Sequence, residues 1–152
     1  MKRQDILENQ AKIVFLGIGS NLGIRKKNIE KAKFLLAEHN LDVLSVSSYY
    51  ETPSWPDPRN PKFLNIIIKL KCYYNPQELL KICKSIENQL GRKKAKKNAK
   101  VNLPHKMMHK RNFVLFPLFE IQKNWIHPDK QIDVKTLISL LPDRDIRSIK
   151  QI

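Results

Sequence analysis

Two short stretches of this chain carry side chains that could bind an anionic ligand with a flat ring. The first spans residues 103–121 and reads LPHKMMHKRNFVLFPLFEI, a basic half followed by an apolar half. Guanidinium and imidazolium groups form strong charge-assisted hydrogen bonds with phosphate oxygens. We therefore expect the basic half to face an anion and the apolar half to form a short buried strand over residues 112–116, ending at Pro117.

The second stretch is a strong strand prediction over residues 63–71. Strand alternation puts Leu64, Ile66, Ile68 and Leu70 on a core face, while Phe63, Asn65 and Ile67 point the other way. An aromatic ring beside an amide suits a heterocycle that is both stacked and hydrogen-bonded. The alternative, commoner for a single asparagine, is that the amide of Asn65 satisfies backbone groups of a neighbouring loop.

Composition predicts a single globular domain over residues 1–152, with a polar extension at 1–11. Hydrophobic residues make up 41% of the chain and the net charge is +15. Residues 88–119 hold nine Lys or Arg and no Asp or Glu, a charge distribution that attracts polyanions. The basic run lacks interleaved aromatic residues, which argues against nucleic acid as a partner. No apolar run suits a membrane span, and two cysteines without a secretory signal predict a cytoplasmic protein.

Periodicity and turn residues predict an alternating order of elements. Strands are expected at 12–18, 42–51, 63–71 and 112–116, and helices at 28–39, 76–90 and 134–141. The middle helix has an Asn75 cap, Pro76 at its first position, Glu78 for a capping box and Gly91 as its stop. The order β-α-β-β-α-β predicts an α+β, ferredoxin-like sandwich, in which helices pack on an antiparallel sheet.

Five motifs, in this order and spacing, resemble the 6-hydroxymethyl-7,8-dihydropterin pyrophosphokinase family. They are Gly19-Ser20-Asn21, SSYYETP at 47–53, Phe63-Leu64-Asn65, IENQLGR at 86–92, and Leu103-Pro104-His105 together with PLFEI at 117–121. The resemblance runs through nearly the whole chain from Lys12. It implies a transferase of folate biosynthesis that binds ATP and a reduced pterin, moves a pyrophosphoryl group onto the pterin hydroxymethyl oxygen and leaves AMP. We expect a monomer.

The resemblance also assigns roles to residues by position. For the pterin, it implies that Phe63 and Phe113 sandwich the ring, that Asn65 bonds its amide edge, and that Thr52 and Pro53 line the pocket through backbone groups. Trp55, in the proline-rich loop that follows, is expected to form part of a lid. Simpler interpretations remain open for two of them: Phe113 as an ordinary core aromatic and Trp55 as an anchor of its loop on the core.

For ATP, the resemblance implies that Glu87 faces the nucleotide and that Arg92, His105 and Arg111 meet its phosphates. Arg92 and Arg111 are the expected catalytic residues, because phosphoryl transfer depends mostly on positioning and charge neutralisation. Taken singly, His105 could instead make a loop hydrogen bond and Arg111 could be a surface charge.

The chain departs from the family between Arg92 and Leu103. The family carries a longer segment there, with an Asp-x-Asp motif that holds two Mg²⁺ ions bridging the ATP phosphates. Here a basic loop at 92–102 fills the gap, and no Asp occurs between Asp57 and Asp129, so the metal ligands are unknown. The Asp143-Arg144-Asp145 sequence has the right spacing but follows the last expected helix, so we interpret it as a surface turn.

Two explanations of this departure are open. The protein has a real deletion, or a segment of it is missing from the sequence as written. The intact motifs on both sides favour the second explanation, because a real loss would also remove a strand that the family's sheet uses.

Two other functions also stay open. One is a catalytically inactive relative that still binds pterin or nucleotide, and the other is a basic RNA-binding module on a ferredoxin-like sheet. Release of AMP would separate the enzyme from both, and steeply salt-dependent RNA binding would single out the module.

Overall fold

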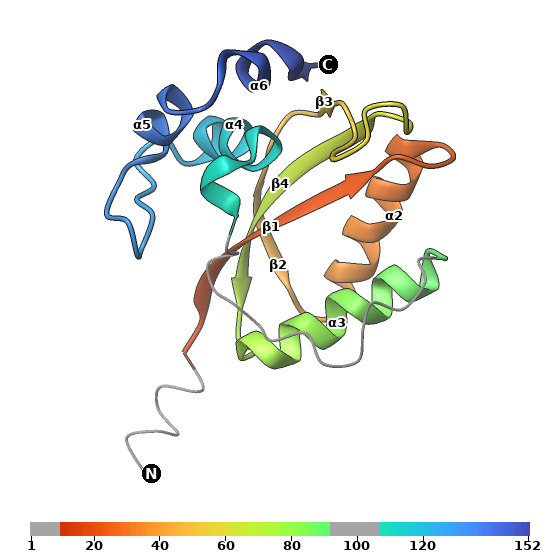
Figure 1. The fold of residues 1–152 in the computed structure, drawn as a ribbon. Helices are drawn as coiled ribbons and strands as arrows, with labels where there is room; N and C mark the ends of the chain where they lie inside the picture. The colour runs from red at the N-terminus through yellow and green to blue at the C-terminus, as the bar shows by residue number, and fades with distance from the viewer. Residues whose placement is uncertain (1–9, 92–106) are drawn as a thin grey trace.

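An antiparallel sheet built around one long strand, β4 (Phe63–Cys72), forms the centre of the structure (Figure 1). On one side β4 pairs with β1 (Lys12–Ser20), and on the other with β2 (Asp42–Val46) and β3 (Tyr50–Thr52). The short β5 (Lys150–Gln151) pairs with β3 and completes the order β1-β4-β3-β5. This computed structural model describes residues 10–91 and 107–152.

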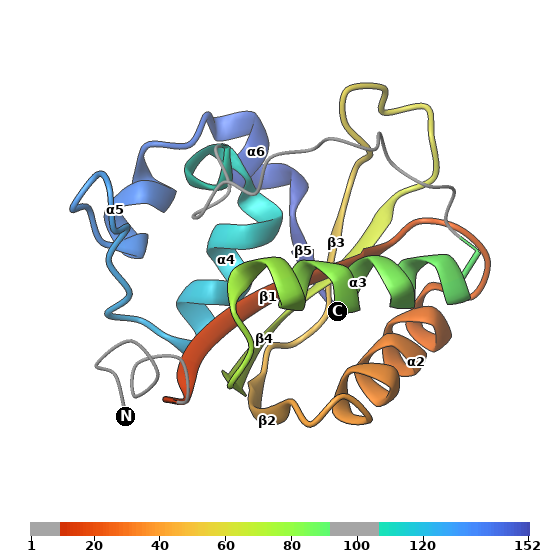
Figure 2. The same ribbon diagram turned by 90° about the horizontal axis from the view of Figure 1, so that it is seen from below.

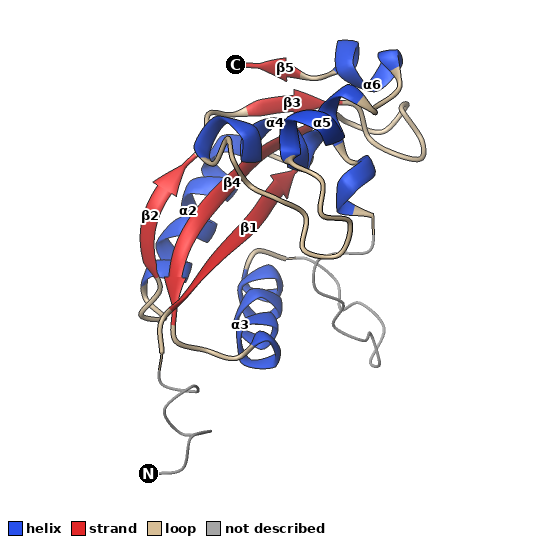
Figure 3. Cartoon of the chain, turned by 90° about the vertical axis from the view of Figure 1, so that its left-hand side faces the viewer, coloured by secondary structure: helices blue, strands red, loops and turns tan. Residues whose placement is uncertain are grey.

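Alternation along β4 gives the sheet a core on each face. Leu64, Ile66, Ile68 and Leu70 are buried in one cluster with residues of α2 (Arg25–Ala37) and α3 (Pro76–Gln89), as the sequence predicted. Ile67 is buried on the opposite face, in a second cluster with α4 (Asn112–Ile121) and α5 (Val134–Ser139). Figures 2 and 3 show these helices on the two sides of the strands. The predicted α+β class is therefore confirmed.

The N-terminus of α3 has the predicted capping box. The Oδ1 of Asn75 accepts from the backbone N–H of Glu78 at 2.8 Å, and the Oε2 of Glu78 accepts from the backbone N–H of Asn75 at 3.1 Å. Pro76 is the first helical residue, and Gly91 adopts a φ of +93° just beyond the helix. These devices are local in sequence, so they could be identified without the fold.

The predicted strand at 112–116 is wrong, because these residues begin the helix α4. A short, unbroken apolar run has no periodicity that separates a buried strand from a buried helix. Leu115 and Leu118, three residues apart, are both buried against Ile67. Pro117 lacks an N–H and breaks the helical hydrogen-bond ladder, yet it is itself buried, so packing outweighs this local cost.

Several smaller features differ from the prediction, among them the helix expected at 28–39, which is α2 at Arg25–Ala37. The strand expected at 42–51 divides into β2 and β3, and between them the backbone N–H and Oγ of Ser47 bond the O and N–H of Ile67, each at 2.9 Å. The last expected helix ends at Ser139 as α5, before the predicted 141. Asp143-Arg144-Asp145 opens a further helix, α6 (Asp143–Ser148), in place of the expected turn. The described part of the chain includes no helix with the length and apolarity to cross a membrane.

Candidate functional site

The amide of Asn65 lies between β4 and β3 and is buried, with 5% of its surface exposed. Its Nδ2 donates to the backbone O of Tyr50 at 3.2 Å and to the Oγ1 of Thr52 at 3.0 Å. The Asn65 NH₂ group therefore satisfies a backbone carbonyl, as the simpler interpretation of this residue proposed. The carbonyl belongs to the neighbouring strand β3 and not to a loop. Because a carbonyl can only accept, the NH₂ must face Tyr50, and the Oδ1 points away from it.

The first strand leaves space beside this amide. Gly19 pairs with Asn65 across β1 and β4. A Cβ placed on Gly19 would lie 3.0 Å from the Oδ1 of Asn65 and 3.4 Å from the Cδ1 of Phe63. Phe63 in turn pairs with Thr52 on β3. Four residues singled out in the sequence, Gly19, Thr52, Phe63 and Asn65, are therefore brought together at one end of the sheet.

We expect an alanine at Gly19 to disturb ligand binding at this end of the sheet. The added methyl group would press on the Oδ1 of Asn65 and on the Phe63 ring. Pterin affinity should fall about tenfold, the equivalent of one lost hydrogen bond.

Gly17 supplies the matched control on the same strand. A Cβ there would lie 3.4 Å from the Cδ1 of Ile67, the end of a flexible side chain. Isothermal titration of both variants with 6-hydroxymethylpterin should show a loss for Gly19→Ala only. An equal loss in both would mean that the glycines serve the sheet and not the ligand.

The proline-rich loop at 53–62 places its residues at different depths. Thr52 and Ser54 are buried, and the Oγ of Ser54 donates to the backbone O of Pro61 at 2.5 Å. Pro53 is half-buried. Trp55 is 83% exposed, so it does not anchor the loop on the core, and its role in a lid stays a prediction.

Arg111 and Phe113 form a second predicted group, at the N-terminus of α4. The Arg111 guanidinium carbon lies 5.5 Å from the centre of the Phe113 ring, and both side chains are half-buried. Within residues 10–91 and 107–152, no carboxylate lies within 4.0 Å of Arg111. The Phe113 ring therefore positions the guanidinium, and no described carboxylate neutralises its charge. This arrangement suits an anionic ligand.

Glu120 has a structural role here that the sequence analysis missed. Its carboxylate accepts from the backbone N–H of Ser48 at 2.8 and 3.0 Å, from the Oγ of Ser48 at 3.0 Å and from the Tyr50 hydroxyl at 2.8 Å. Burial, with Glu120 alongside, raises the pKa of Tyr50, which keeps the phenol protonated as a donor. Glu120 thus ties α4 to the start of β3. A lone carboxylate inside the apolar run at 113–121 was the available signal.

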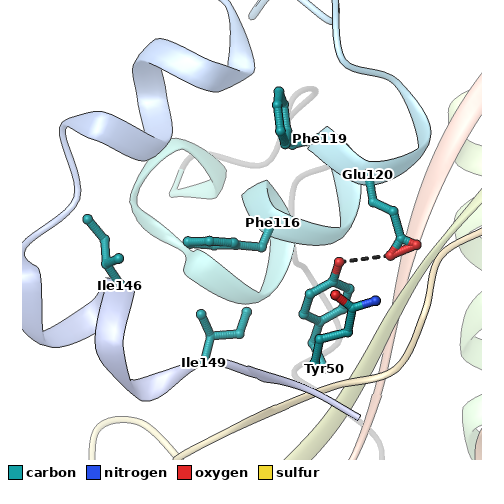
Figure 4. Close-up of a pocket in the computed structure, with 7 residues that line it drawn as sticks. Tyr50, Phe116, Phe119, Glu120, Ile146 and Ile149 are labelled. Carbon is teal, nitrogen blue, oxygen red and sulfur yellow. Dashed lines mark hydrogen bonds between the residues drawn. The ribbon is translucent and has the colours of Figure 1, made fainter.

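Figure 4 shows the hollow beside this tie, between α4 and the C-terminal residues. Its volume is about 410 Å³, and its walls include Phe116, Phe119, Ile146 and Ile149. Three donors within the protein engage both Glu120 oxygens, namely the Ser48 N–H, which the two oxygens share, and the hydroxyls of Ser48 and Tyr50. We therefore interpret Glu120 as a structural tie and not as a ligand-binding group.

Of the remaining predicted residues, only Glu87 is described, and it does not join these two groups. Glu87 is exposed on α3, in the helical layer on the other face of the sheet from α4. Arg92 and His105, and the basic loop at 92–102, lie outside the described residues.

The Mg²⁺ ions that the resemblance implies do not fit the described residues. These contain no group of three or more His, Cys, Asp or Glu side chains that could hold a metal ion. The sequence adds no acidic residue between 92 and 106. Asp143 and Asp145, which have the spacing of the family motif, instead lie in the first turn of α6, where negative charge favours the helix dipole.

Comparison with known proteins identifies relatives along most of the chain. The family model described as 7,8-dihydro-6-hydroxymethylpterin-pyrophosphokinase matches residues 15–123. The 2-amino-4-hydroxy-6-hydroxymethyldihydropteridine pyrophosphokinase of Aquifex aeolicus is 35% identical, over 76% of this chain and 83% of its own. The Bacillus subtilis protein of that name is 34% identical, over 72% and 77%. The folic acid synthesis protein fol1 of Schizosaccharomyces pombe is 30% identical over 90% of this chain but only 21% of its own.

These alignments also contain positions that this chain does not fill. The alignment with the Aquifex protein has 134 positions but takes in 76% of 152 residues, or about 116, so about 18 positions face a gap in this chain. The alignment with the Bacillus protein has 129 positions but takes in 72% of this chain, or about 109 residues. About 20 of its positions therefore face a gap in this chain. The relatives therefore carry residues within the matched region that have no counterpart here.

The matches include the strands and the helix α4 that position Phe63, Asn65, Arg111 and Phe113. The identity to the Aquifex protein extends over most of both chains. The chain belongs to the 7,8-dihydro-6-hydroxymethylpterin pyrophosphokinase family, the ATP-dependent transferases of folate biosynthesis.

Proposed function

We propose that 6-hydroxymethyl-7,8-dihydropterin binds at the end of the sheet formed by Phe63, Asn65 and Thr52, with Phe113 covering its other face. The observation that carries this proposal is the fixed amide of Asn65. Its NH₂ is held by Tyr50 and Thr52, and its oxygen lies beside the open backbone of Gly19. An acceptor held in one orientation beside an aromatic ring suits the donor-bearing edge of a pterin.

The phosphates of ATP are proposed to bind at Arg111, with Glu87, Arg92 and His105 completing the nucleotide site as the family resemblance implies. In the reaction, the hydroxymethyl oxygen bonds to the β-phosphorus of ATP while the bond to the oxygen bridging the α- and β-phosphates breaks. AMP leaves and the hydroxyl proton is lost. Arg111 would hold the phosphates in line and offset their charge, because its guanidinium is already oriented by Phe113.

A cytoplasmic location and a monomeric state belong to the same proposal, whereas the Mg²⁺ that the family resemblance implies has no fitting ligands among the described residues. The net charge of +15 supports attraction of ATP from solution. The sheet face carrying Asn65 is covered by α4, which leaves little room for a nucleic-acid strand on that face.

Replacing Arg111 by alanine tests the nucleotide assignment. ATP affinity should fall by about tenfold to a hundredfold, because hydrogen bonds to charged groups contribute about 1.5–3 kcal/mol. Pterin affinity should change much less. Both affinities can be measured by isothermal titration, at low and high salt, since a phosphate contact weakens as salt is added.

Lys110→Ala is the matched control, because Lys110 is an exposed cation next to Arg111 in the chain. It should leave both affinities close to those of the unaltered protein. If Arg111→Ala weakened both ligands equally, or neither, the residue would be structural or merely exposed.

A second function is favoured by one observation, namely that no aspartate between Asp57 and Asp129 can supply the carboxylate pair of the family's Asp-x-Asp motif. A family member of this kind would bind pterin and nucleotide without transferring the pyrophosphoryl group. Both functions predict the same ligand binding, and only the enzyme releases AMP.

A further inference from the structure

Arg25 joins two segments that frame the proposed pterin site. It is the first residue of α2 and follows the turn at the end of β1. Its Nη2 lies 2.8 Å from the Oε2 of Glu51, and its Nη1 donates to the backbone O of Lys62 at 3.0 Å. Glu51 and Lys62 stand at the two ends of the loop at 53–62, so one guanidinium connects both ends. Figure 1 shows this loop, between β3 and β4, beside the turn that precedes α2.

The turn that carries Arg25 is itself braced. The Nδ2 of Asn28 donates to the backbone O of Leu22 at 2.9 Å and to the Oγ of Ser20 at 3.1 Å. Gly23 has a φ of +61°, a conformation that glycine adopts at little cost. The hydrogen bonds of Asn28 hold the turn against the first turns of α2, so Arg25 reaches the loop from a fixed base.

Arginine is suited to this contact in a way that lysine is not. Its planar fork can donate to two acceptors at once, whereas an ammonium group is a compact charge at the end of a flexible stem. The side chains of Arg25 and Glu51 are 29% and 23% exposed, so their ion pair is screened less than one in open solvent.

We propose that Arg25 is a positioning residue for pterin binding, which fixes the ends of the loop at 53–62. The inference rests on the proposed function. Thr52 and Phe63 directly follow Glu51 and Lys62, and they pair with each other across β3 and β4. The ladder sets the separation of these two residues, and Arg25 adds a side-chain clamp at the point where the loop leaves the ladder. A loop whose ends are already ordered loses less conformational freedom when ligand binds.

The test compares Arg25→Ala, Glu51→Ala and the double variant in full-length protein, titrated with 6-hydroxymethylpterin and, separately, with ATP. Each single variant should bind pterin about tenfold more weakly, a change of the size expected for ordering one or two extra side chains. The double variant should be no weaker than Arg25→Ala, because that substitution already removes both the contact with Glu51 and the contact with Lys62. ATP affinity should stay the same in all three.

Arg59→Ala is the matched control. Arg59 lies within the same loop and pairs with Asp57 at 2.9 Å, but the pair does not connect the loop to α2. Its pterin affinity should be unchanged. Arg25→Lys, which keeps the charge, should lose less affinity than Arg25→Ala, and it provides a folded variant if the alanine variant does not fold.

The possible results distinguish failure of the proposed function from failure of the positioning role of Arg25. If the unaltered protein binds no pterin, the proposed function fails and the role of Arg25 fails with it. If that protein binds pterin and folded Arg25 variants bind it equally well, the proposed function stands and the positioning role is wrong. A lower melting temperature with unchanged pterin affinity would likewise reduce Arg25 to a structural residue.

Discussion

Replacing Asn65 by alanine should weaken pterin binding by at least about tenfold and should also lower the free energy of unfolding by about 1–3 kcal/mol. Both effects have one origin in the buried amide, which bonds the O of Tyr50 and the Oγ1 of Thr52. The substitution leaves these partners with fewer hydrogen bonds and removes the oxygen proposed to meet the ligand. Isothermal titration with 6-hydroxymethylpterin gives the first quantity, and urea denaturation gives the second.

Leu64→Ala separates the ligand effect from the stability effect. Leu64 is the neighbouring residue, 5% exposed, but its side chain lies in the core on the opposite face of β4. The cavity left by the missing side chain should cost about 2–5 kcal/mol of stability. Pterin affinity measured on the folded protein should nevertheless stay unchanged. Unaltered pterin binding by Asn65→Ala would show that the pocket does not include this amide.

The parts of the fold that the sequence predicted are those encoded by local patterns. The alternation of β4 was visible because apolar side chains recur at every second position, and the cap of α3 because Asn75, Pro76 and Glu78 are adjacent. The helix α4 was not predictable in the same way. Its residues are apolar at nearly every position, and the choice of helix over strand depends on packing against Ile67 and α5.

In the candidate site, too, the residues identified by local patterns were predicted and the contacts between distant segments were not. The face of β4 that carries Phe63 and Asn65 follows from alternation, and the family motifs supplied their roles. The groups that hold the site together were not visible, because they connect segments far apart in sequence. Glu120 bonds Ser48, 72 residues earlier, and Arg25 bonds the O of Lys62, 37 residues later. No spacing rule relates such pairs, and only the packing of α2 and α4 against the sheet brings them together.

A polypeptide of only these 152 residues should show no Mg²⁺-dependent formation of AMP. Pyrophosphoryl transfer needs the charge on the ATP phosphates bridged and neutralised. Residues 58–128 contain no aspartate, so the carboxylate pair that the family motif supplies has no counterpart in that part of the chain. The lysines of the basic loop can attract phosphates, but an ammonium group has no lone pair with which to coordinate Mg²⁺.

The assay should therefore be joined to a measurement of intact mass. The protein is incubated with ATP, Mg²⁺ and 6-hydroxymethyl-7,8-dihydropterin, and AMP is quantified, with the Aquifex aeolicus relative as the active control. If AMP appears, the mass should exceed the 17.9 kDa of this sequence, and peptide mapping should place an Asp-x-Asp segment between Arg92 and Leu103. AMP formation by a protein of 17.9 kDa would contradict the prediction that these 152 residues are inactive. Such activity would require metal ligands, or another means of neutralising the phosphate charge, that the family resemblance does not provide.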